Sequence, residues 1–205
     1  MPVGLKGNSD GSGAIQIGGS DAISISTGLN TTFAGTITAT GTVAGTTGTL
    51  YPLVSGTAVS ATGTAVDFTG IPSWVRRITV MLNGVSTNGT SDFLVQIGSG
   101  SVTTSGYSSQ RAFIQTATAN ASTNNTNGIL FIATQSAADA KVGHAVLTNV
   151  SGNIWVASAT IATINSMFCW SAGSITLGGT LDRVRITTVN GTDTFDAGTI
   201  NILFE

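Results

Sequence analysis

Few side chains in this sequence are of the types that perform catalysis. Hydroxyl-based nucleophilic catalysis needs a histidine to accept the proton, and His144 is the only one. Strand-like alternation in residues 142–146 places His144 on the face opposite Ala145, as a surface or hydrogen-bonded strand residue. Glycoside cleavage needs two carboxyl groups that face each other. Asp193 and Asp196 are close in sequence, but their Gly- and Thr-rich surroundings favour a turn in which Asp binds local backbone amides. The sequence therefore predicts no enzyme.

Metal ions and cofactors are equally poorly supported. Cys169 is the only cysteine, which excludes an internal disulfide and a cysteine-based zinc site. Residues 8–13 have the start of a calcium loop, but the bidentate Glu expected further along is missing. The Gly-x-Gly of residues 11–13 has no following helix to form a phosphate site. We expect no metal and no cofactor.

A polar, glycine-rich loop offers the best candidate for ligand binding. It covers residues 98–111, where an exposed Tyr107 could stack on a sugar and Gln110 and Arg111 could bind hydroxyl groups. The alternative is an ordinary hairpin loop. The three tryptophans, Trp74, Trp155 and Trp170, are better interpreted as core or subunit-interface residues, because the chain has few other large side chains.

Strands must position these residues, because helical periodicity is almost absent. Thr, Val and Ile fit a pleated sheet, and Asn-Gly pairs at 83, 88, 127 and 190 indicate tight turns. Short strands at such spacing are typical of a sandwich or barrel. The one helix-like piece, residues 136–141, is at most a turn or two long. Predicted strands cover residues 75–84, 92–98, 111–118, 129–134, 143–149, 153–161, 181–189 and 197–204.

Charge is unusually scarce. Charged residues make up 8% of the chain, against about 25% in an ordinary soluble domain, and none lies between Asp21 and Asp67. Seven dispersed Lys and Arg residues cannot neutralise a phosphate backbone, so nucleic acid is not an expected partner. No apolar run is long enough to insert into a membrane. A chain that lacks charge repulsion is expected to cover its surface by permanent self-association.

The first 55 residues differ from the rest, with glycine every few positions and regularly placed large apolar residues. One copy would bury too little to offset the backbone entropy lost on ordering. Two or three intertwined copies could share an apolar axis; the alternative is a disordered Gly/Thr linker. We place the boundary near Tyr51-Pro52, giving segments 1–55 and 56–205. The predicted axis residues are Ile15, Ile17, Ile23, Ile25, Phe33 and Ile37.

Three segments resemble a known family. Residues 69–80 (TGIPSWVRRITV) and 181–202 (LDRVRITTVNGTDTFDAGTINI) resemble the C-terminal domains of bacteriophage tail-fibre and other virion appendage proteins. Residues 13–35 are similar to the N-terminal modules that precede such domains. The resemblance implies an all-β homotrimer: a short intertwined N-terminal β segment, which attaches to the virion, followed by an antiparallel, jelly-roll-like β-sandwich.

Two functions stay open at this stage. The first is a tail fibre that is anchored by residues 1–55 and contacts host surface polysaccharide through C-terminal loops. The second is a capsid-decorating, cement or head-fibre protein that stabilises the phage head. Both predict other phage structural proteins as partners. Since residues 1–7 lack the apolar segment of a secretory signal, both also predict assembly into virions in the host cytoplasm. A depolymerising spike is disfavoured by the missing pair of carboxylates.

Overall fold

The computed structural model describes residues 4–7, 13–16, 43–45, 48–115, 118–134, 136–137, 139–164 and 167–205. The chain divides into two compact units, Met1–Val43 and Ala44–Glu205. In the first unit, β1 (Gly4–Gly7) pairs antiparallel with β2 (Gly13–Gln16). The short strands β3 (Val43–Gly45) and β4 (Gly48–Leu50) form another two-stranded sheet. The boundary predicted near Tyr51-Pro52, with segments 1–55 and 56–205, stays a prediction.

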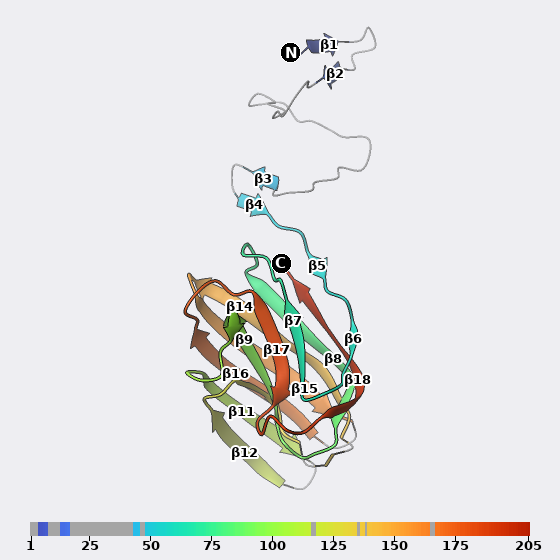
Figure 1. Cartoon of the computed structure of the whole chain (residues 1–205), viewed down its shortest axis with the longest axis vertical. Helices are drawn as coiled ribbons and strands as arrows, with labels where there is room; N and C mark the ends of the chain where they lie inside the picture. Colours follow the sequence, from blue (N-terminus) through green and yellow to red (C-terminus); the bar gives the residue numbers. More distant parts are fainter. Residues whose placement is uncertain are drawn as a thin grey trace. The chain divides into compact units, whose positions relative to one another are not determined.

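The second unit contains two larger antiparallel sheets (Figure 1). The nine-stranded sheet has the order β12-β11-β16-β15-β14-β8-β18-β5, and β6 also pairs with β18. Its strands are β5 (Val54–Ser55), β6 (Val59–Ser60), β8 (Arg77–Thr87), β11 (Ser108–Gln115), β12 (Thr118–Asn125), β14 (Lys141–Ser151), β15 (Ile154–Thr163), β16 (Met167–Thr176) and β18 (Phe195–Phe204).

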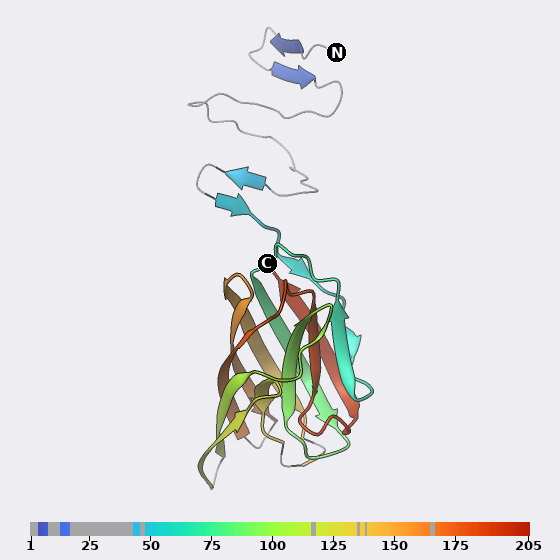
Figure 2. The same ribbon diagram turned by 60° about the vertical axis from the view of Figure 1, so that its left-hand side comes forward.

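The five-stranded sheet has the order β10-β9-β17-β7, and β13 also pairs with β9. The chain crosses repeatedly between the two sheets, which lie one over the other in both ribbon views (Figures 1 and 2). The strands of this smaller sheet are β7 (Ala65–Thr69), β9 (Phe93–Ser99), β10 (Ser101–Val102), β13 (Ile129–Ile132) and β17 (Arg183–Thr188).

One buried apolar cluster takes residues from both sheets. Strand β15 shows how the sequence produces it: Trp155, Ala157, Ala159 and Ile161 are buried, and the residues between them point outward. Since side chains alternate across a strand, one face of β15 joins the core. From the smaller sheet, β9, β13 and β17 contribute side chains to the same cluster, including Val95, Phe131 and Ile186.

The prediction of an all-β, antiparallel fold is confirmed, since the described residues contain strands and turns and no helix. Each predicted strand overlaps an observed one. Strands β10, β12 and β16 were missed, as were β1 and the short strands between residues 43 and 70. In the helix-like piece, the amide of Asp139 donates to the carbonyl of Ser136 at 3.1 Å, which closes a turn. The jelly-roll-like sandwich and the trimer stay predictions.

Candidate functional site

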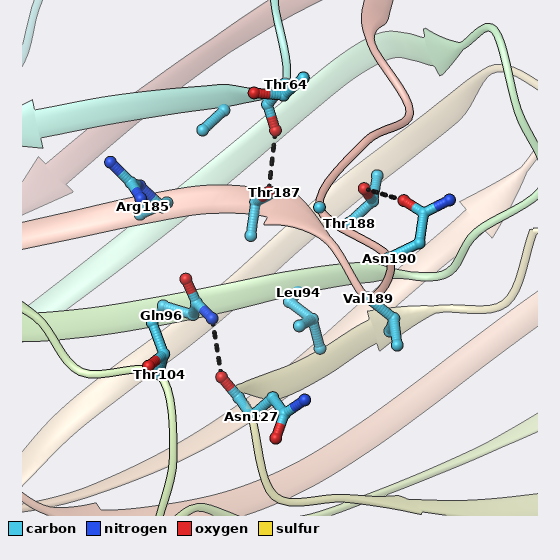
Figure 3. A pocket seen from close by; sticks show the side chains of 12 residues that line it. Thr64, Leu94, Gln96, Thr104, Asn127, Arg185, Thr187, Thr188, Val189 and Asn190 are labelled. Carbon is cyan, nitrogen blue, oxygen red and sulfur yellow. Dashed lines mark hydrogen bonds between the residues drawn. The ribbon is translucent and has the colours of Figure 1, made fainter.

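The outer face of the smaller sheet carries a pocket of about 260 Å³ (Figure 3). Strands β7, β9 and β17 form its floor, and the segments after β10, β12 and β17 form its rim. The residues that line it are almost all uncharged: Thr64, Ala65, Leu94, Gln96, Thr104, Asn127, Arg185, Thr187, Thr188, Val189, Asn190 and Gly191.

Two hydrogen bonds hold the floor of the pocket. Gln96 is buried and donates from Nε2 to the backbone oxygen of Asn127 at 2.8 Å, and the hydroxyl of Thr187 donates to the backbone oxygen of Thr64 at 2.8 Å (Figure 3). Leu94, two residues before Gln96 in β9, is also buried and supplies an apolar patch. Among the described residues, neither the carboxamide oxygen of Gln96 nor the hydroxyl of Thr104 has a hydrogen-bond partner. Both are therefore available to a ligand.

The rim after β17 is a rigid turn, as the Asn-Gly pair at 190 predicts. The Asn190 side-chain oxygen accepts from the amides of Thr192 and Asp193 at 3.0 and 3.1 Å, and from the Thr188 hydroxyl at 2.9 Å. Gly191 has a φ of 67°, which a residue without Cβ adopts at low cost. Asp193 also accepts from the amide of Ser91 at 2.9 Å. The turn is thus fixed before any ligand binds.

The one charged residue of the lining is neutralised within the protein. Arg185 in β17 binds Asp67 in β7 through two parallel contacts, Nε–Oδ1 and Nη2–Oδ2, each 2.7 Å. This bidentate hydrogen bonding to Asp67 holds the pKa of Arg185 above its ordinary value. An anionic ligand would have to compete with Asp67 for the guanidinium. The pocket therefore favours a neutral ligand with several hydroxyl groups and a small apolar face.

The expectation that Tyr107 is exposed is wrong. Its side chain is 2% exposed, and its hydroxyl accepts from the amide of Ile97 at 2.9 Å and lies 2.9 Å from the carbonyl of Thr103. Burial raises the pKa of Tyr107 to about 12. The loop folds back on β9, because the amide of Thr103 donates to the carbonyl of Ile97 at 3.0 Å. Tyr107 therefore anchors this loop and cannot stack on a sugar in this conformation.

The other two candidate glycan residues point to opposite faces of β11. Gln110 is exposed on the outer face of the nine-stranded sheet, whereas Arg111 is buried on the inner face. Arg111 forms an ion pair with Asp92 at 2.5 Å, and its Nε and Nη1 have no hydrogen-bond partner among the described residues. The structure does not bring Tyr107, Gln110 and Arg111 together into one surface.

A buried lysine lies close to this ion pair. Lys141 is fully buried at the start of β14, donates from Nζ to the carbonyl of Asp139 at 2.8 Å, and lies 4.7 Å from the ring centroid of Phe93. Burial lowers the pKa of Lys141 to about 8, although Asp139 and Asp92 oppose that shift. The burial of Lys141 could not be predicted from the sequence, because a lysine at the end of a strand is normally exposed to solvent. Lys141 is not among the residues that line the pocket.

The structure also gives the positions of the other site residues that the sequence suggested. His144 is exposed on β14, and Asp196 accepts from the hydroxyl of Ser86 at 2.5 Å. Ile15 lies in β2 and pairs with Leu5; Ile17, Ile23, Ile25, Phe33 and Ile37 lie outside the described residues. Within the described ranges, no three His, Cys, Asp or Glu residues gather as metal ligands.

No helix within the described part of the chain is long and apolar enough to cross a membrane. No protein-family model, no curated protein and no solved structure matches this chain.

Proposed function

We propose that this chain is a structural protein of a bacteriophage virion, a homotrimeric tail fibre built on a jelly-roll-like sandwich. Residues 1–55 attach it to the particle, and residues 56–205 contact polysaccharide on the host surface. The resemblance of residues 69–80 and 181–202 supports the virion assignment, and the scarcity of charge supports permanent assembly. Three weak sites on each trimer, multiplied by several trimers on a particle, would give firm attachment by avidity.

The observation that carries the contact with polysaccharide is the neutral pocket between β7, β9 and β17. It replaces the surface around Tyr107 as the proposed sugar site. The Gln96 oxygen, the Thr104 hydroxyl and the Asn127 side chain offer hydrogen bonds to hydroxyl groups, while Leu94 and Val189 offer apolar contact. Loop residues supply much of this lining, which agrees with recognition through C-terminal loops.

Saturation-transfer NMR with neutral and acidic methyl glycosides tests the sugar site. We expect signals from a neutral glycoside, and their loss in Ala65→Trp, whose indole would occupy the pocket. Asn127→Ala removes a rim side chain and keeps the backbone oxygen that Gln96 binds, so it should weaken binding about tenfold, as loss of one hydrogen bond does.

Gln110→Ala is the matched control, because Gln110 is exposed on the opposite sheet. Wild-type signals in this variant would support the pocket. Signals that disappear with Gln110→Ala and persist in Ala65→Trp would contradict it. Binding confined to acidic glycosides would contradict the neutral ligand class.

A capsid-decorating or head-fibre protein is the second candidate. It is favoured by exposed apolar side chains on the outer face of the nine-stranded sheet, since a cement protein needs an apolar underside. Position on the particle separates the two functions.

A further inference from the structure

Large apolar side chains gather on the outer face of the nine-stranded sheet. The outward positions of β11, β14, β15 and β16 form what we call the uncharged face. Ile114 is 51% exposed, Phe168 44% and Trp170 41%, and Ile154 and Val156 are also exposed there. These positions contain no Asp, Glu, Lys or Arg, and their one titratable side chain is that of His144.

Strand register makes these residues neighbours. Ile114 in β11 is paired with Phe168 in β16, and Ala112 with Trp170. The rings of Phe168 and Trp170 lie 6.0 Å apart, centroid to centroid, with a tilt of 43°. On the next strand, Thr160 is paired with Trp170. The aromatic pair, near the start of β16, therefore lies between Ile114 and Ala112 of β11 on one side and Thr160 and Ala162 of β15 on the other.

The opposite outer surface, on the smaller sheet, is different. Asp67 and Thr69 of β7 point outward there, and Asp67 pairs with Arg185 of β17. An antiparallel sheet that faces water on one side normally has polar residues on that side. The uncharged face combines polar outward residues such as Ser158 and Thr160 with five exposed large apolar side chains, those of Ile114, Ile154, Val156, Phe168 and Trp170. Contiguous exposed apolar surface of this kind marks a contact with another molecule.

We propose that another copy of this chain covers the uncharged face, so that in the trimer three such faces are directed at the threefold axis. Choosing a copy as the occupant rests on the proposed homotrimer. A face without charge needs a partner surface without charge, because a charged group buried against it would be desolvated and unpaired. The uncharged face itself meets this need, with small residues such as Ala112 and Ala172 beside the rings of Phe168 and Trp170.

The size of the face agrees with this assignment. Four strands spaced about 4.8 Å apart and about ten residues long, at ~3.3 Å per residue, cover roughly 600 Å². A standard stable interface buries about 800 Å² on each partner, so the face has an area of the same order. Large aromatic side chains such as Phe168 and Trp170, flanked by Ile114 and small residues, are the types that dominate the binding energy of interfaces.

Analytical ultracentrifugation of the full chain tests the proposal. Wild type should sediment as a multiple of the 20.5 kDa monomer. Thr160→Glu places a carboxylate beside Trp170 at an exposed position, and should raise the subunit dissociation constant at least 100-fold. Thr69→Glu, an exposed Thr on the smaller sheet, is the matched control and should leave the mass unchanged. Circular dichroism checks that both variants fold.

Crosslinking gives a second readout that does not depend on weakening the interface. Ala172→Cys places a thiol on the uncharged face, while native Cys169 is buried. A short bismaleimide should join subunits of Ala172→Cys and not of Thr69→Cys. If wild type is oligomeric, and Thr160→Glu keeps its mass with no crosslink at residue 172, the face assignment is wrong while the proposed assembly stands. A monomeric wild type would overturn both.

Discussion

The hydroxyl of Tyr107 and the backbone amide of Ile97 lie 2.9 Å apart in the interior of the domain. The contact ties the segment before β11 to the middle of β9, at a point where β9 is also paired with β17. An aromatic residue in a glycine- and serine-rich loop thus has an internal, structural role.

Tyr107→Phe should therefore destabilise the domain. The substitution leaves the amide of Ile97 buried without its acceptor, which costs about 1–3 kcal/mol of unfolding free energy. Tyr51→Phe is the control, because the Tyr51 ring is 41% exposed and stacks on Trp74 at 5.4 Å; it should change stability by less than ~0.5 kcal/mol. Denaturant unfolding measures both. Equal stability of the two variants would argue against the anchoring role of Tyr107.

Removing only one partner of the Asp92–Arg111 ion pair should lower the free energy of unfolding more than removing both charges does. Asp92→Ala leaves the Arg111 guanidinium buried without its counter-ion and removes the acceptor of the Thr134 amide; we expect a loss of about 3–5 kcal/mol. The double variant with Arg111→Met should recover part of that loss. A double-mutant cycle measures the coupling, and strictly additive effects would contradict it.

The buried ammonium of Lys141 should make stability depend on pH. Its folded pKa of about 8 lies below its ordinary value of 10.5, so between these values the unfolded chain binds more protons than the folded one. The contribution of Lys141 to the free energy of unfolding therefore rises with pH between these two pKa values, by at most ~1.4 kcal/mol per pH unit. Below pH 8 both states carry the proton and the unfavourable burial of charge is fully present.

Chemical unfolding of wild type and Lys141→Met between pH 8 and 10 isolates this effect. Burial also raises the pKa of the Cys169 thiol, which acts in the opposite direction, and the charge of Lys141 partly opposes that rise, so both proteins also carry Cys169→Ala. Wild type should gain stability relative to Lys141→Met as pH rises. Parallel curves for the two proteins would show that Lys141 does not titrate in this range.

Two glycines of β14 and its following turn should respond differently to alanine. Gly143 has a φ of 135°, and a Cβ there would lie 2.3 Å from the carbonyl oxygen of Thr160. Gly152, with a φ of 52°, has open space around that position. Gly152→Ala should cost about 1–2 kcal/mol from backbone strain, and Gly143→Ala distinctly more. Thermal unfolding ranks them, and a larger loss for Gly152→Ala would contradict the close approach of β14 to β15.

Sequence predicted the strands that alternate large apolar and polar residues, such as β8, β15 and β18. Strand β12 was missed because Thr118–Asn125 has no large apolar residue, and pairing with β11 determines its conformation. Much of β16 is Ala, Gly and Ser, so the alternation of large apolar and polar side chains that predicts a strand is weak there. The Asn-Gly pair at 190 correctly predicted a turn at the rim of the pocket.

The pocket itself could not be predicted from the sequence. Thr64, Gln96, Asn127 and Asn190 are far apart along the chain, and only the pairing of β7, β9 and β17 brings them together. Burial of Tyr107 and Lys141 likewise depends on the opposing sheet. Local composition suggests solvent exposure for both.

Immunogold electron microscopy of intact phage particles tests the central claim most directly. An antibody against residues 56–205 should place gold at the tail, near the surface that meets the host. Gold distributed over the head would contradict the tail-fibre assignment and favour decoration. Particles without gold, in a preparation where the antibody recognises the purified protein, would contradict a virion protein altogether.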